Sequence, residues 1–260
     1  MITLTTAQLE TWIGQLFWPF LRIGACLMVA PIFGARFVPR QTRLIIAGAI
    51  ALLIAPMITL PPGVTAFSGA GVVITANEVL IGLAMGFILQ VIFDSLAMGG
   101  QLLSNSMGLS FAFNVDPMRG ASTPVLGQFY MLLVTLTFLA LNGHLTLIRT
   151  LVDGFATLPV GGDGLGRDGL WMVVTWGQQL FAGALAVALP GMTALMVVNL
   201  GFGVMSRAAP TLNLFAVGFP ITLIFGLVIL LAGLPSVQTS FIDLIGEALD
   251  LVRSLLRLPA

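Results

Sequence analysis

Charged side chains are scarce in this sequence of 260 residues, of which they make up only 8%. An ordinary soluble domain carries roughly 25% charged residues. Hydrophobic residues make up 58%, so the composition excludes an ordinary soluble protein and predicts a membrane protein. Lysine is absent and the ten arginines balance ten carboxylates, which leaves no excess of positive charge to bind nucleic acid.

Cysteine and histidine are represented by one residue each, Cys26 and His144. A single cysteine excludes an intramolecular disulfide, and these two residues are too few for a zinc cluster. No acidic residue lies within eight positions of His144, so the chain offers no obvious activated nucleophile. We therefore expect no enzymatic activity, no cofactor and no bound metal.

Uncharged stretches divide the chain into candidate membrane spans. No charged residue occurs in 44–77, 120–148, 169–206 or 208–242. Each stretch exceeds the about 20 residues that cross a bilayer as a helix, and backbone groups in lipid must be bonded internally. The predicted fold is an all-α membrane protein with about six hydrophobic segments, at 12–35, 44–60, 70–93, 124–148, 170–200 and 212–234.

The fifth segment is too long for one straight span, and Pro190 lies in its middle. It is either a kinked, tilted helix or a hairpin of two short helices. After the sixth segment, residues 240–258 predict an amphipathic helix that opens with the capping box of Ser240 and Asp243. We expect this helix to lie in the membrane interface or against a partner.

Small residues recur at intervals of four along several predicted spans, which lets helices approach closely in lipid. The sets are Ala47, Ala51 and Ala55, then Gly82 and Gly86, then Ala182 and Ala186. We expect these residues mainly to pack the chain against itself, with contacts to other subunits as the alternative.

Two charged residues fall within predicted spans, Arg22 in the first and Glu78 in the third. A lone charge at such depth costs several kcal/mol unless it is paired or hydrated. One hypothesis is that the two form a salt bridge with each other. The alternative is that each faces a partner subunit or a water-filled path.

The stretch 94–120 is too apolar for a solvated loop and too polar for lipid. Gln101 and Asn105 lie on one predicted helix face with small residues, and we expect this face to meet protein or water. After it, the breaker Asp116-Pro117 favours a re-entrant loop that occludes a pore, with a plain connecting loop as the alternative. The candidate plug residues are Ser106, Met107, Phe111, Phe113 and Met118.

A second unusual stretch, 199–220, sets a charge and helix breakers in an apolar region. Pro210 and Pro220 interrupt helices, while Arg207 and Asn213 need polar partners. We expect a broken helix that is buried in protein, with Arg207 and Asn213 holding the break or a seam between subunits.

Three motifs resemble the FliR family, the flagellar member of the type III secretion export-gate proteins. They are VAPIFGARFVPRQTR (29–43), MGGQLLSNSMGLSFAFNVDP (98–117) and VMSRAAPTLNLFAVGFP (204–220). The resemblance covers nearly the whole chain as one domain. It implies a FliP-like part at about 1–200, a FliQ-like helical hairpin at about 201–260, and a plug at about Ser106 to Arg119.

The resemblance also implies a function and partners. Such proteins form a hetero-oligomeric gate with FliP and FliQ subunits, FlhB and FlhA in the bacterial inner membrane, at the flagellar basal body. Unfolded flagellar proteins are exported through that gate, and membrane lipid surrounds it. The alternatives are a virulence-type homologue of the same gate and a secondary transporter in which Glu78 or Asp94 carries protons.

Overall fold

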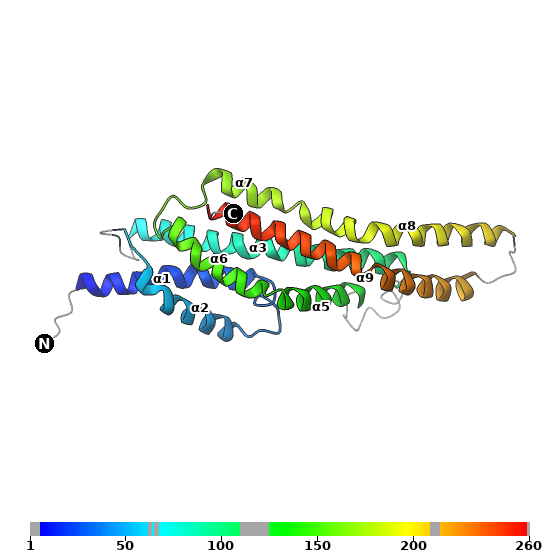
Figure 1. The fold of residues 1–260 in the computed structure, drawn as a ribbon, viewed down its shortest axis with the longest axis horizontal. Coiled ribbons are helices and arrows are strands. Elements are labelled where there is room, and N and C mark those ends of the chain that lie inside the picture. Colours follow the sequence, from blue (N-terminus) through cyan, green and yellow to red (C-terminus); the bar gives the residue numbers. More distant parts are fainter. Residues whose placement is uncertain (1–5, 62–63, 65–67, 110–124, 209–213, 259–260) are drawn as a thin grey trace. The chain divides into compact units, whose positions relative to one another are not determined.

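A computed structural model describes residues 6–61, 64, 68–109, 125–208 and 214–258. Within these residues every regular element is a helix (Figure 1). In this described part of the chain, five helices are long and apolar enough to span a membrane, or up to six if one bent helix pair is counted as a span. The prediction of an all-α membrane protein with about six hydrophobic segments is therefore confirmed.

The chain forms two compact units, each built from segments that are distant in sequence. Unit 1 comprises Met1–Val91, Leu139–Gly177 and Gly246–Ala260, and unit 2 comprises Ile92–Phe138 and Gln178–Ile245. Two long helices contribute to both units, namely α3 (Gly69–Ser106) and α9 (Leu214–Leu255).

Unit 1 also contains α1 (Thr6–Val29), α2 (Arg40–Ile54), the short 3-10 helix η1 (Ala55–Met57), α6 (Gly143–Thr157) and α7 (Gly166–Trp176). Glycines set the distance between α1 and α3. A Cβ at Gly82 would collide with the carbonyl oxygen of Arg22, and one at Gly86 would lie 2.8 Å from that of Cys26. These two glycines thus pack the chain against itself, as do the buried Ala47 and Ala51 of α2.

Unit 2 contains the last part of α3, α5 (Val125–Ala140), α8 (Gln179–Ala208) and most of α9. Its core includes Phe93, whose ring meets those of Phe138 and Phe241 edge-on at centroid distances of 5.4 and 5.5 Å. All three rings are at most 1% exposed. Edge-to-face contacts of this kind add to the apolar burial that holds α3, α5 and α9 together.

Several expected helix bounds are wrong. The third helix continues beyond residue 93 to Ser106. For the fifth segment, α8 runs through Pro190, which excludes the alternative of a hairpin at that proline. The expected span 124–148 is instead broken into α5 and α6. The break is at Asn142, whose φ of 56° is left-handed, a conformation that asparagine tolerates better than most residues.

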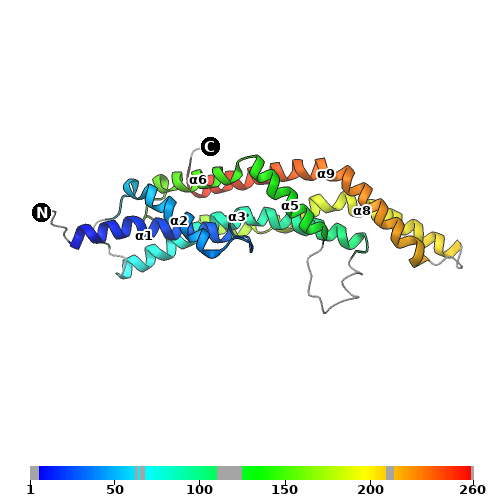
Figure 2. The ribbon, with the colours of Figure 1, turned by 90° about the horizontal axis from the view of Figure 1, so that it is seen from below.

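The prediction of a separate helix at 240–258 is also wrong, because α9 is continuous through Ser240 (Figure 2). The reason is a stripe of buried residues that repeats every three or four positions across the expected boundary, formed by Val237, Phe241, Ile245, Ala248 and Val252. The end of the chain is amphipathic as predicted, but its apolar face packs within the chain rather than lying free.

Candidate functional site

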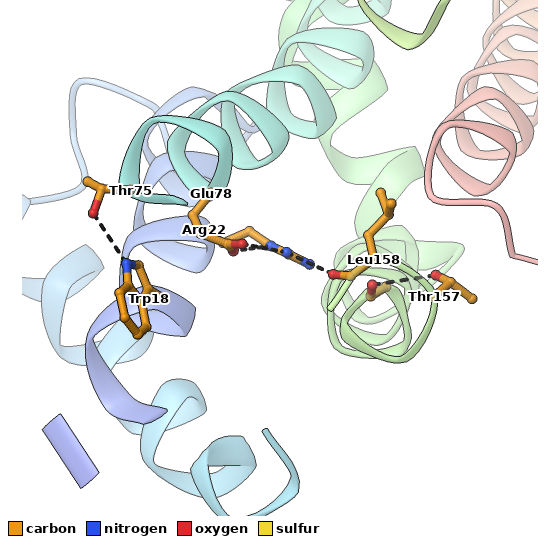
Figure 3. A network of polar contacts seen from close by, with 7 residues as sticks. Trp18, Arg22, Thr75, Glu78, Thr157 and Leu158 are labelled. Atoms are coloured by element: carbon orange, nitrogen blue, oxygen red, sulfur yellow. Dashed lines mark hydrogen bonds and ion pairs between the residues drawn. The ribbon is translucent and has the colours of Figure 1, made fainter. Parts of the chain in front are cut away.

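The strongest polar site in unit 1 joins the two charges that the sequence places within membrane spans. Arg22 Nε donates to Glu78 Oε2 at 2.6 Å, and Arg22 Nη2 donates to Glu78 Oε1 at 2.9 Å (Figure 3). Arg22 is 0% exposed and Glu78 is 1% exposed. The salt-bridge hypothesis is therefore confirmed, in the two-pronged geometry that gives guanidinium–carboxylate pairs their strength.

A third segment completes this ion pair. Arg22 Nη2 also donates to the carbonyl oxygen of Leu158 at 2.9 Å, just after the end of α6. The guanidinium carbon lies 4.1 Å from the centre of the Phe155 ring. A cation at a helix C-terminus and over an aromatic face is stabilised by the helix dipole and the ring quadrupole. Arg22 thus ties α1, α3 and α6 together in unit 1.

Other polar contacts follow the same face of α1. Trp18 donates from Nε1 to Thr75 Oγ1 at 3.3 Å (Figure 3). Gln15 donates from Nε2 to the carbonyl oxygen of Ile58 at 3.1 Å. With Arg22 these residues are three and four positions apart, so they share one face of the helix. This face therefore joins α1 to neighbouring segments of unit 1.

Unit 2 carries a second candidate site, an open groove of about 890 Å³. It is lined by Asn105, Ser106, Met107, Gly108, Asn199, Phe202, Gly203, Ser206, Gly218, Phe219 and Thr222. These residues come from the end of α3, the last part of α8 and the start of α9. Its lining includes hydroxyl and amide groups together with two phenyl rings, so it can contact both polar and apolar groups.

The polar residues predicted at the end of α3 lie partly in this groove. Gln101 and Asn105 are exposed, as expected for a face that meets other protein or water. Ser106 is half-buried and Met107 is only 1% exposed. The Met107 side chain packs against Gly226 of α9, where an added Cβ would lie 2.5 Å from Met107 Cε.

The residues predicted for the broken helix are only partly described. Arg207 is exposed in the last turn of α8, and Pro190 and Pro220 are exposed within α8 and α9. Phe111, Phe113, Met118, Pro210 and Asn213 lie outside the described residues. Sequence reasoning missed Asn199, which is exposed eight residues before Arg207 on the same helix face.

Comparison with known proteins agrees with this membrane architecture. The model of a family described as bacterial export proteins, family 1, matches residues 13–248. The chain belongs to this family. Its relatives include flagellar biosynthetic proteins FliR, one from Escherichia coli that is 37% identical and one from Pectobacterium carotovorum that is 36% identical, each over 98% of both sequences.

A more distant relative shows how broadly the family extends. The flagellar biosynthetic protein FliR of Bacillus subtilis is 26% identical over 92% of this chain and 93% of its own length. The family match and these relatives indicate a component of the flagellar export apparatus that lies in a membrane. A transporter unrelated to export is not favoured by these findings.

Proposed function

We propose that this protein is a non-enzymatic subunit of the flagellar protein export gate, in the bacterial inner membrane at the flagellar basal body. With FliP, FliQ and FlhB, and beside FlhA, it helps to form the gated channel through which unfolded flagellar proteins are exported. Residues at about 1–200 supply a FliP-like part and residues at about 201–260 supply a FliQ-like part.

The observation that carries this proposal is the set of polar side chains left exposed on the apolar helices of unit 2. They include Gln101, Asn105, Asn199 and Arg207. Amide and charged side chains are costly to place against hydrocarbon, so such residues face protein or water rather than lipid. Neighbouring subunits or a hydrated channel would supply those surroundings, whereas a solitary subunit would not.

The groove of unit 2 supports the same proposal. Gly203 lies on its α8 wall, with Gly201 two residues before it, and an added Cβ at either glycine would meet no atom within 4 Å. Exposed small residues on a membrane helix allow a second helix to approach closely. The groove therefore offers a surface on which a helix of another gate subunit can pack.

Mild-detergent purification of a tagged full-length copy, followed by mass measurement of the intact particle, tests this role. We expect the other gate subunits to co-elute in a fixed ratio. A stable particle that contains this chain alone, from cells that make the complete apparatus, would refute the proposal.

The plug assignment of Ser106, Met107, Phe111, Phe113 and Met118 remains a sequence-based prediction within this proposal. A cysteine placed at Phe113 is expected to crosslink to a flagellar protein stalled during export. The matched control is a cysteine at Val125, which is 70% exposed at the start of α5. Equal labelling of both positions by every stalled protein would count against a plug in the channel.

A further inference from the structure

The connection between α1 and α2 in unit 1, residues 30–40, forms a cationic turn. It lies within the motif VAPIFGARFVPRQTR (29–43). Arg36 and Arg40 are exposed, and among the described residues neither has an ion-pair partner within 4.0 Å. Phe37, next to Arg36 in the chain, is 78% exposed. The cationic turn therefore presents an aromatic ring together with two cations that lack a counter-charge.

A third arginine holds the cationic turn in its conformation. Arg43 Nη2 donates to the carbonyl oxygens of Ala35 and Val38 at 2.5 and 3.0 Å. The turn also packs closely on the end of α1, because a Cβ at Gly34 would lie 2.7 Å from the carbonyl oxygen of Met28. Since this order exists before any contact with another molecule, little conformational entropy would be lost on binding.

The positive charge at the turn is not compensated by nearby acidic residues. Arg40 and Arg43 both lie in the first turn of α2, which contains no acidic residue. The helix dipole is positive at this end, so it makes further cations unfavourable. The nearest carboxylates along the chain are Glu10 and Glu78, and Glu78 is already paired with Arg22. An anionic group of another molecule would neutralise this excess of charge.

The level of the turn along the neighbouring helices favours a protein carboxylate over a lipid headgroup. A Cβ at Gly86, in the middle of α3, would lie 2.9 Å from the backbone nitrogen of Ala30. Two residues further, the carbonyl oxygen of Ile88 accepts from Trp176 Nε1, which lies well inside the candidate span Gly166–Ala208. Charges at such a level pair with protein groups. Because α1 and α2 themselves end at the turn, the test must also detect a lipid.

We propose that the cationic turn docks on a neighbouring subunit of the export gate, at a segment where carboxylates flank an apolar pocket. Phe37 enters the pocket, and Arg36 and Arg40 each pair with a carboxylate. Aromatic and arginine side chains contribute most to an interface when the partner encloses them. Guanidinium groups match carboxylates in geometry and charge. This docking rests on the proposed function, because the neighbour is another subunit of the gate.

Photo-crosslinking in the purified intact complex identifies the molecule at the turn. With p-benzoylphenylalanine in place of Phe37, we expect a crosslink to one segment of another subunit, with acidic residues beside the crosslinked position. The matched control places the same crosslinker at Trp171, which is 68% exposed on α7 and should not reach that segment. A phospholipid adduct, a peptide without acidic residues, or a crosslink confined to this chain would each overturn the proposal.

Charge reversal tests the two arginines. Arg36→Glu combined with Arg40→Glu should lower the yield of intact complex per folded subunit about tenfold, because each partner carboxylate would face a like charge. Arginines in place of the carboxylates of the crosslinked segment should restore the yield. Arg167→Glu is the matched control, since Arg167 is an exposed arginine at the start of α7.

The results separate this docking from the gate function itself. Normal assembly of the double variant would overturn the docking and leave the gate function in place. An equal loss with Arg167→Glu, or no recovery when the partner's charges are also reversed, would overturn the specific pairing. A lower unfolding temperature of the isolated double variant that accounts for the whole loss would mean that the arginines stabilise their own chain. A wild-type chain that purifies alone would refute both the gate function and the docking.

Discussion

The charged pair at the centre of unit 1 and the polar residues at one end of unit 2 differ in their exposure. Unit 1 encloses Arg22 and Glu78 so completely that they are 0% and 1% exposed, and each supplies the other's counter-charge. Unit 2 leaves Asn105, Asn199 and Arg207 exposed on helices that are otherwise apolar. The difference indicates that unit 1 supplies the counter-charge of its own buried ion pair, while these exposed polar groups of unit 2 would rely on surroundings that other molecules supply.

Removal of one member of the buried ion pair should give the largest loss of stability and is the strictest test of this difference between the units. Arg22→Leu should destabilise the protein by about 3–5 kcal/mol, because Glu78 would be left as an uncompensated buried charge. Thermal unfolding of the purified protein in detergent measures the loss. The pairing explains the effect only if the double variant Arg22→Leu with Glu78→Leu recovers most of the stability, since an apolar pair needs no counter-charge.

A matched exposed pair serves as the control for that experiment. Asp250 and Arg253 also form an ion pair, but their side chains are 75% and 41% exposed. Exposed pairs contribute little because water screens both charges. Asp250→Asn should therefore leave the unfolding temperature almost unchanged, and a loss as large as that of Arg22→Leu would show that burial is not the cause.

The close contact between α1 and α3 in unit 1 gives the next largest expected effect. Gly82→Ala places a methyl group against the carbonyl oxygen of Arg22, and a helix backbone cannot move aside easily. We expect a loss of about 1–3 kcal/mol, as for other overpacked cores. Gly48→Ala is the control, since an added Cβ there meets no atom within 4 Å. Equal unfolding temperatures of the two variants would contradict the close approach of α1 and α3.

The corresponding substitution in unit 2 should be milder. Gly226→Ala meets the side chain of Met107, whose flexible thioether can rearrange where the backbone in unit 1 cannot. A destabilisation of about 1 kcal/mol is expected from this overpacking. Combination with Met107→Ala should remove the clash, so the Gly226→Ala step should cost less in that background. An equal cost with and without Met107 would disprove the contact as its cause.

The sequence allowed prediction of those features that depend on local composition. The helical class and the approximate number of spans follow from the uncharged stretches, and the pairing of Arg22 with Glu78 follows from the cost of charge in lipid. The contact of this ion pair with Leu158 could not be predicted, since Leu158 is 136 residues from Arg22 and contributes only its backbone carbonyl. Every residue has a backbone carbonyl, so the residue type at a position does not reveal such a contact.

Helix bounds were less predictable because tertiary packing outweighed local signals. Ser240 and Asp243 form a capping pattern, yet α9 continues through them since Val237 and Phe241 are buried on one stripe. The opposite error occurred at Asn142, where an apolar stretch without charge conceals a break between α5 and α6. The Asn-Gly pair at 142–143 is the signal that could have identified it.

The smallest effect on stability is expected where unit 2 exposes its polar groups. Arg207→Ala should change the stability of the isolated protein by less than about 0.5 kcal/mol, because the side chain is exposed and makes no ion pair among the described residues. The same substitution should reduce the yield of intact complex, since a polar group of the neighbouring subunit would lose its hydrogen-bond partner, the Arg207 side chain. Leu200→Ala, a change at an exposed apolar residue on the same helix, is the matched control. The opposite result would be a lower unfolding temperature with an unchanged yield of complex per folded subunit. It would mean that Arg207 stabilises its own chain, and the contrast between the two units would not hold at this residue.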